Sequence, residues 1–73
     1  MHLDEFEHLV TEFLGRKPSA PFDTERGLEF HPDFDSFSVI HLILFIENKK
    51  QLRLEAEEIN RIKVLSDFLR VCK

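Results

Sequence analysis

The sequence predicts an all-α domain with three main helices, one short helix and a long loop between the first two helices. Apolar residues recur at helical spacing in separate segments, and Pro and Gly gather in one long interval. No segment alternates apolar and polar residues beside a hairpin turn signal, so strands are not expected. A chain of 73 residues allows one domain, which we expect to span residues 1–73.

The first helix is expected over residues 3–14, where Leu3, Phe6 and Val10 recur three or four positions apart. Acidic residues in its first turn suit the positive end of the helix dipole. Gly15 follows directly, and glycine is the residue that most often ends a helix.

Residues 16–34 are predicted to form the long loop, because prolines and a glycine interrupt them and no apolar period survives. A loop of this length in a small domain must pack against the helices. Its expected anchors are four large apolar residues: Phe22, Leu28, Phe30 and Phe34.

The second helix is expected over residues 36–49, with either Asp35 or Ser36 as its N-cap. Lys49 and Lys50 place positive charge at its end, where the dipole favours it. Residues 55–60 are expected to form a short helical turn, and residues 64–72 the last helix.

The second helix is apolar on nearly all sides, since eight of the ten residues from 37 to 46 are apolar. The other elements of so short a chain cannot bury every side of it. Part of the set Phe37, Ile40, Leu44 and Phe45 must therefore face water or a partner, and such a strip usually marks an interaction site. The alternative is that the Phe-rich loop folds over the helix and covers it.

Composition argues against several functional classes. The net charge is −4, with 14 acidic and 10 basic residues, which disfavours nucleic acid as the main partner. The single cysteine, Cys72, cannot form an internal disulfide, and no apolar run approaches 18 residues, so we expect a cytoplasmic protein without membrane insertion. The short chain leaves little room for a preorganised active site, so an enzyme is not expected.

Two stretches resemble the acyl carrier protein family, which includes the peptidyl and aminoacyl carrier domains. "DSFSVIHLILFIE" is similar to the Asp-Ser-Leu segment that opens the second helix of that family, with Phe37 in the place of Leu. "INRIKVLSDFL" is similar to the closing pattern of the last helix. The order of helices and the loop length agree with the family as well, so the resemblance covers essentially the whole chain.

The resemblance implies that Ser36 is esterified with 4′-phosphopantetheine, which a separate transferase takes from coenzyme A. It also implies that Asp35 orients this serine or places the metal ion of the transferase. The chain would then be a non-catalytic, monomeric carrier of acyl or aminoacyl intermediates, held as thioesters, in fatty-acid, polyketide or other lipid and secondary biosynthesis. Its partners would be the transferase and the enzymes that load and use the acyl group.

The departures from the family pattern lie in and around the second helix. Asp33 stands where many relatives have glycine, and Ser38, His41 and Asn48 stand where relatives often have acids. These replacements weaken an electrostatic docking face and suggest a specialised carrier with more hydrophobic recognition. The expected partner-binding residues are Phe37, Ile40, His41, Leu44 and Glu47.

The same residues allow four other interpretations, two of which are disfavoured. Ser36 is a plain helix cap in any chain that lacks this modification. A catalytic pair of Ser36 and His41 is disfavoured, because residues five apart do not stack on a helix. A metal site at "HPDFD" is not expected, because the Pro and the alternating acids are typical of a turn before a capped helix. The whole chain is alternatively a small helical interaction module or a carrier that has lost its arm.

Overall fold

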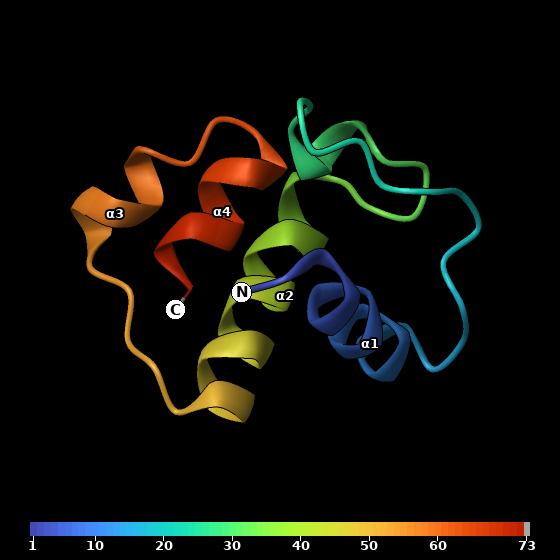
Figure 1. Ribbon diagram of the computed structural model, residues 1–73, viewed down its shortest axis with the longest axis horizontal. Coiled ribbons are helices and arrows are strands. Elements are labelled where there is room, and N and C mark those ends of the chain that lie inside the picture. The colour runs from blue at the N-terminus through green and yellow to red at the C-terminus, as the bar shows by residue number, and fades with distance from the viewer. Residues whose placement is uncertain (73) are drawn as a thin grey trace.

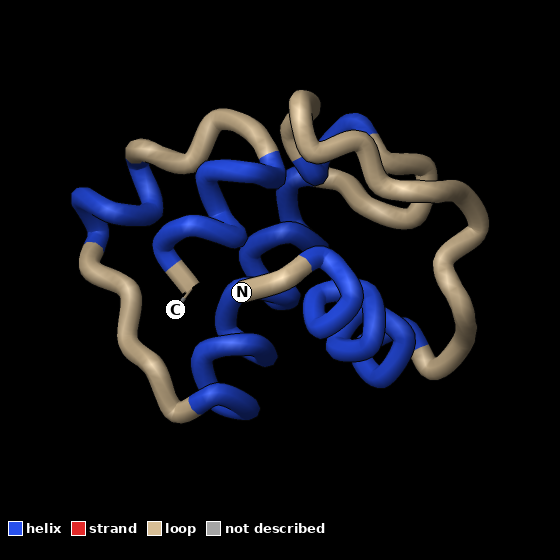
Figure 2. The backbone as a smooth tube through the Cα atoms, viewed as in Figure 1, coloured by secondary structure: helices blue, strands red, loops and turns tan. Residues whose placement is uncertain are grey.

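The structure, a computed structural model that describes residues 1–72, contains helices and no strand within that range. The elements are α1 (Leu3–Leu14), the 3₁₀ turn η1 (Leu28–Phe30), α2 (Ser36–Lys50), α3 (Ala56–Asn60) and α4 (Leu65–Val71). Figure 1 shows α2 between α1 on one side and α3 and α4 on the other. Figure 2 shows the long connection from α1 to α2, interrupted only by η1. The predicted all-helical class and the long loop are confirmed.

The first helix begins and ends where the sequence predicts. α1 buries Phe6 and Val10 against the core and keeps Asp4 and Glu5 in its exposed first turn. Gly15 takes the left-handed conformation at φ 73°, and its N–H donates to the carbonyl of Thr11. A side chain at this φ would be strained, so the glycine is a structural requirement of the helix end.

The central helix runs one residue beyond its predicted end, to Lys50, and Gln51 closes it in the left-handed conformation at φ 53°. The extra residue is held by an ion pair that the sequence does not reveal, between Lys50 Nζ and Glu5 Oε2 at 2.6 Å. Lys49 Nζ lies 3.5 Å from Glu12 Oε2 in the same way. The end of α2 is therefore tied to α1 by two charge pairs.

One core joins the helices. Phe68 of α4 is fully buried and meets the fully buried Phe6 of α1 edge-on, with ring centroids 5.8 Å apart. Cys72 is fully buried in the same core, and this burial raises the pKa of its thiol to about 11. The remaining members of the core are Val10, Leu28, Phe34, Leu42, Ile43, Ile46, Leu54 and Leu65.

The last helix is shorter than predicted, because Val64 forms its N-cap and Cys72 its C-cap. Val64 has no side-chain acceptor for the first turn. Asp67 compensates, since its carboxylate accepts the backbone N–H groups of Lys63 at 3.0 Å and Val64 at 3.3 Å.

Three of the four predicted loop anchors pack inward, and one prediction is wrong. Leu28 and Phe34 are buried and Phe22 is half-buried, but Phe30 is 68% exposed. The reason lies in η1, a three-residue turn that buries Leu28 and leaves Phe30 in solvent. The Phe30 ring instead faces the Arg26 guanidinium, whose carbon lies 5.8 Å from the ring centroid.

Candidate functional site

Ser36 lies at the start of α2 with a hydroxyl that the helix cap does not use. The N-cap is Asp35, whose Oδ1 accepts the N–H of Ser38 at 2.8 Å. The Ser38 hydroxyl in turn accepts the N–H of Asp35 at 3.0 Å. This capping box is complete without Ser36, which is exposed and forms no side-chain hydrogen bond to any of residues 1–72. The question of which residue caps the helix is thereby answered in favour of Asp35.

The cap also sets the charge beside Ser36. Hydrogen bonds from the Ser38 backbone, and then from the Ser38 hydroxyl, lower the pKa of Asp35 below its usual value. A carboxylate that is ionised at neutral pH therefore occupies the N-terminus of α2, next to the free hydroxyl.

Asp33 anchors the segment that precedes Ser36, and its side chain is only 5% exposed. Arg16 donates to Oδ1 at 2.9 Å, the Ser19 N–H donates to Oδ2 at 2.7 Å, and the Ser19 hydroxyl donates to Oδ1 at 2.7 Å. These contacts close the beginning of the long loop onto its end. Asp33 thus has a structural role of its own.

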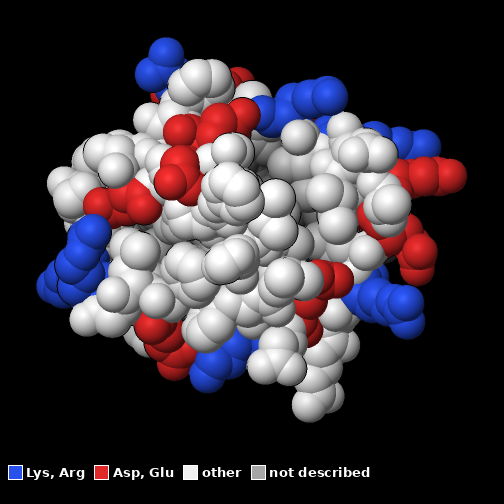
Figure 3. Space-filling view, turned by 180° about the vertical axis from the view of Figure 1, so that it is seen from behind, with Lys and Arg blue, Asp and Glu red and all other residues white. Residues whose placement is uncertain are grey.

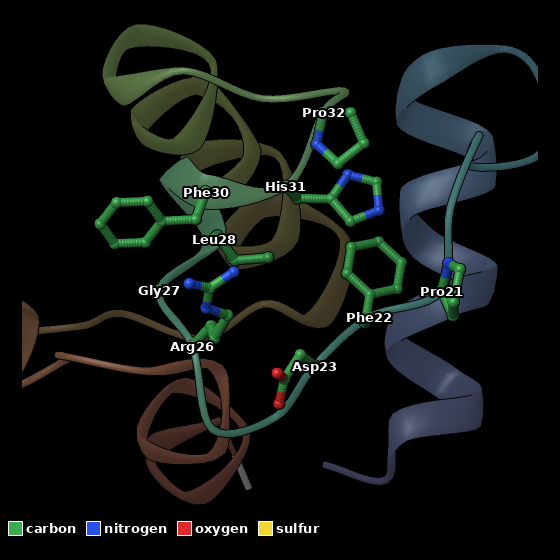
Figure 4. A pocket seen from close by; sticks show the side chains of 9 residues that line it. All are labelled: Pro21, Phe22, Asp23, Arg26, Gly27, Leu28, Phe30, His31 and Pro32. Atoms are coloured by element: carbon green, nitrogen blue, oxygen red, sulfur yellow. The ribbon is translucent and has the colours of Figure 1, made fainter.

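His31 provides the second anchor of this segment. The ring is buried, Nδ1 accepts the N–H of Asp33 at 3.1 Å, and Nε2 lies 2.8 Å from the carbonyl of Ala20, to which it donates. Figure 4 shows its imidazole beside the ring of Phe22. The two rings stack with their centroids 4.4 Å apart. No group of three potential metal ligands occurs within residues 1–72, and Asp35 is engaged in the helix cap.

Ser36 borders an apolar groove of about 230 Å³ that the sequence did not reveal. α2 supplies one wall of the groove, and the segment from α3 to α4 supplies another. The groove is lined by Gly27, Leu28, Glu29, Ser36, Val39, Ile40, Ile43, Ile59, Ile62, Lys63, Val64, Leu65 and Phe68. The sequence could not indicate it, because the lining comes from η1, α2, α3 and α4 together.

The predicted apolar strip on α2 is exposed for the most part. Phe37 is 76% exposed, Ile40 55% and Leu44 59%, while Phe45 is half-buried against Phe13 of α1, with ring centroids 5.4 Å apart. The spacing of three and four residues places the first three on one side of the helix. The long loop therefore does not cover this strip.

The two polar residues of the predicted partner face differ in their surroundings. His41 is exposed on α2. Glu47 is half-buried, and its Oε2 accepts the N–H of Leu54 at 2.8 Å. Glu47 thus holds the connection between α2 and α3, which leaves α2 without an acid that is free for docking.

Charged side chains lie mainly around the edges of one face of the molecule. Figure 3 shows this face, which is turned away from the viewer in Figure 1. Uncharged side chains cover most of its middle, and Lys, Arg, Asp and Glu lie around them. No helix within residues 1–72 has the length and hydropathy needed to cross a membrane.

Comparison with known proteins gives no match, either to a family model, to a curated protein or to a solved structure.

Replacing Asp33 with asparagine is expected to lower the melting temperature at pH 7. Hydrogen bonds to its carboxylate lower the pKa of Asp33 far below its usual value, and the bond from Arg16 has a larger effect than those from Ser19. A lowered native pKa gives stability that is present above the unfolded value of about 3.9 and is lost as the pH falls through the native value. The difference between Asp33→Asn and wild type should therefore narrow below about pH 4. Thermal melts followed by circular dichroism from pH 3 to pH 8 measure this.

Glu25→Gln is the matched control, because Glu25 is an exposed acid of the same loop without an ion pair in residues 1–72. It should melt like wild type at every pH. An Asp33→Asn variant as stable as wild type at pH 7 would contradict the role assigned to this carboxylate.

Proposed function

We propose that the chain is a carrier protein that holds acyl intermediates on a 4′-phosphopantetheine arm attached to Ser36. The observation that carries the proposal is the free, exposed hydroxyl at the first position of α2, which the capping box of Asp35 and Ser38 leaves unused. A plain capping serine would spend its hydroxyl on the helix end. This residue therefore fits the attachment of such an arm.

The arm would supply a thiol at the end of a flexible tether, on which acyl groups ride as thioesters. Tethering raises the effective concentration of the carried group at each partner enzyme. This chain would contribute the attachment point and the surface that partners recognise, and it would catalyse no step itself. A separate transferase would use coenzyme A and a metal ion to modify Ser36.

The groove beside Ser36 favours the proposal that the carried group is apolar. Its lining is made mostly of Val, Ile, Leu and Phe side chains, which favour burial of hydrocarbon and oppose burial of an unpaired charge. Among the possible cargoes, an acyl group of fatty-acid or polyketide type suits this lining better than a charged aminoacyl group.

The partner face proposed for this carrier is the apolar strip of Phe37, Ile40 and Leu44, with His41 beside it. The strip also supports the alternative that the chain is an interaction module without the arm, since exposed apolar patches mark binding sites in general. The two functions differ in whether Ser36 is modified.

Replacing Ser36 with alanine is expected to abolish modification by a broad-specificity phosphopantetheinyl transferase with coenzyme A and Mg²⁺. Intact-protein mass spectrometry measures the outcome, and the wild-type chain should gain one phosphopantetheine. Ser66→Ala is the control, because it keeps both the Ser36 hydroxyl and the capping box of α2 and should still be modified. Modification of Ser36→Ala to the same extent as wild type would refute the assignment of this serine.

A further inference from the structure

The groove beside Ser36 carries two charges in an otherwise uncharged lining, namely Glu29 and Lys63. The Glu29 carboxylate folds back over Gly27, where an added Cβ would collide with it. Lys63 is exposed, and its ammonium group forms no ion pair within residues 1–72. The cation of the groove is therefore available to a ligand, while the anion lies against the backbone of the protein.

The backbone of Lys63 is fixed although its side chain is free. Its N–H donates to Asp67 Oδ2 at 3.0 Å, in the same contact that caps α4. This bond holds the α-carbon of Lys63 at the groove, which Ser36 borders from α2. Lys63 and Ser36 therefore line the same groove from two different elements.

A cation at the groove would attract an anion attached to Ser36. The phosphodiester of the arm carries one negative charge, and the N-terminus of α2 already holds the ionised carboxylate of Asp35. The first turn of α2 contains no basic residue. The two lysines of the helix, Lys49 and Lys50, lie in its last turn, where they pair with Glu12 and Glu5. Among the residues that line the groove, Lys63 alone offers positive charge to a group on Ser36.

We propose that Lys63 is a positioning residue, which pairs with the phosphodiester on Ser36 and directs the arm towards the apolar groove. This inference rests on the proposed function, because it requires the arm. A surface ion pair is weak between free groups, but attachment to Ser36 holds the phosphate at high effective concentration near the ammonium group. The pair should weaken as salt screens it.

The test compares wild type with Lys63→Glu, each first converted to the modified form and checked by intact mass. Attachment of the arm is followed by the ³¹P resonance of the phosphodiester and by the amide resonances of Ile59, Ile62 and Leu65. In wild type these amides should shift on attachment, and the shifts should shrink at least twofold in Lys63→Glu or in 0.5 M salt. The ³¹P resonance should move in the same variant.

Arg61→Glu is the matched control, because Arg61 is an exposed basic residue two positions away that does not line the groove. It should leave both sets of resonances as in wild type. A modified Lys63→Glu chain with wild-type ³¹P and amide shifts would overturn the role of Lys63 and leave the carrier function intact. A wild-type chain that accepts no arm would overturn the proposed function, and this inference with it.

Discussion

Replacing Phe68 with alanine is expected to lower the free energy of unfolding by about 3–5 kcal/mol. The ring is fully buried, meets Phe6 edge-on and lies in the core that joins α4 to α1 and α2. Its removal takes apolar surface out of the core and leaves a cavity that a small domain refills poorly. Since small domains are stable by only about 5–15 kcal/mol, the variant should lose a large share of its stability.

Urea unfolding followed by circular dichroism measures the effect, and Phe30→Ala is the matched control. Phe30 is 68% exposed, so its truncation should change the free energy of unfolding by less than about 0.5 kcal/mol. If Phe68→Ala does not fold, Phe68→Leu should give an intermediate loss, since it keeps most of the buried volume. A Phe68→Ala variant within 1 kcal/mol of wild type would contradict the core as described.

Replacing Leu44 with glutamate is expected to lower the kcat/KM of a phosphopantetheinyl transferase for this chain by about ten- to a hundredfold. Burial of a leucine contributes about 1.5–3 kcal/mol, and each 1.4 kcal/mol corresponds to a factor of ten. Leu44 is 59% exposed beside Ile40 and Phe37, so the change should act on recognition and leave the free energy of unfolding nearly unchanged.

The same variant separates apolar docking from electrostatic docking. No free acid is present on α2, because the Glu47 carboxylate binds the N–H of Leu54. If partners instead recognised acidic charge, Leu44→Glu would be modified as fast as wild type or faster. Lys17→Glu, which adds an acid on the exposed surface of the long loop, is the control and should behave as wild type.

The helices could be predicted from the sequence because their signals are local. The spacing of Leu3, Phe6 and Val10 and the glycine after Leu14 define α1 without reference to the rest of the chain. α2 ends one residue later than predicted, where Lys50 pairs with the distant Glu5, and α4 is one residue shorter than predicted at each end. Local patterns place elements, and tertiary contacts adjust their ends.

The interior of the long loop could not be predicted in the same way. His31 and Asp33 are held by Ala20, Ser19 and Arg16, which are 11 to 17 positions away in the sequence. Phe30 was expected to be buried because it is large and apolar, but a three-residue turn has no period from which its inward side can be read.

The candidate site was predictable in part. The sequence places Ser36 at the mouth of α2 and predicts an exposed strip on the same helix, and both expectations about position are confirmed. It did not show that Ser38 shares the cap with Asp35, or that Lys63 lines a groove with Ser36. The first depends on rotamers and the second on the packing of α2 against the segment before α4.

The mass of the intact wild-type chain after incubation with coenzyme A, Mg²⁺ and a competent phosphopantetheinyl transferase tests the central claim most directly. The account predicts a gain of one phosphopantetheine per chain, located by fragmentation at Ser36. A chain that stays unmodified, while a known carrier is modified completely by the same transferase preparation, would contradict it.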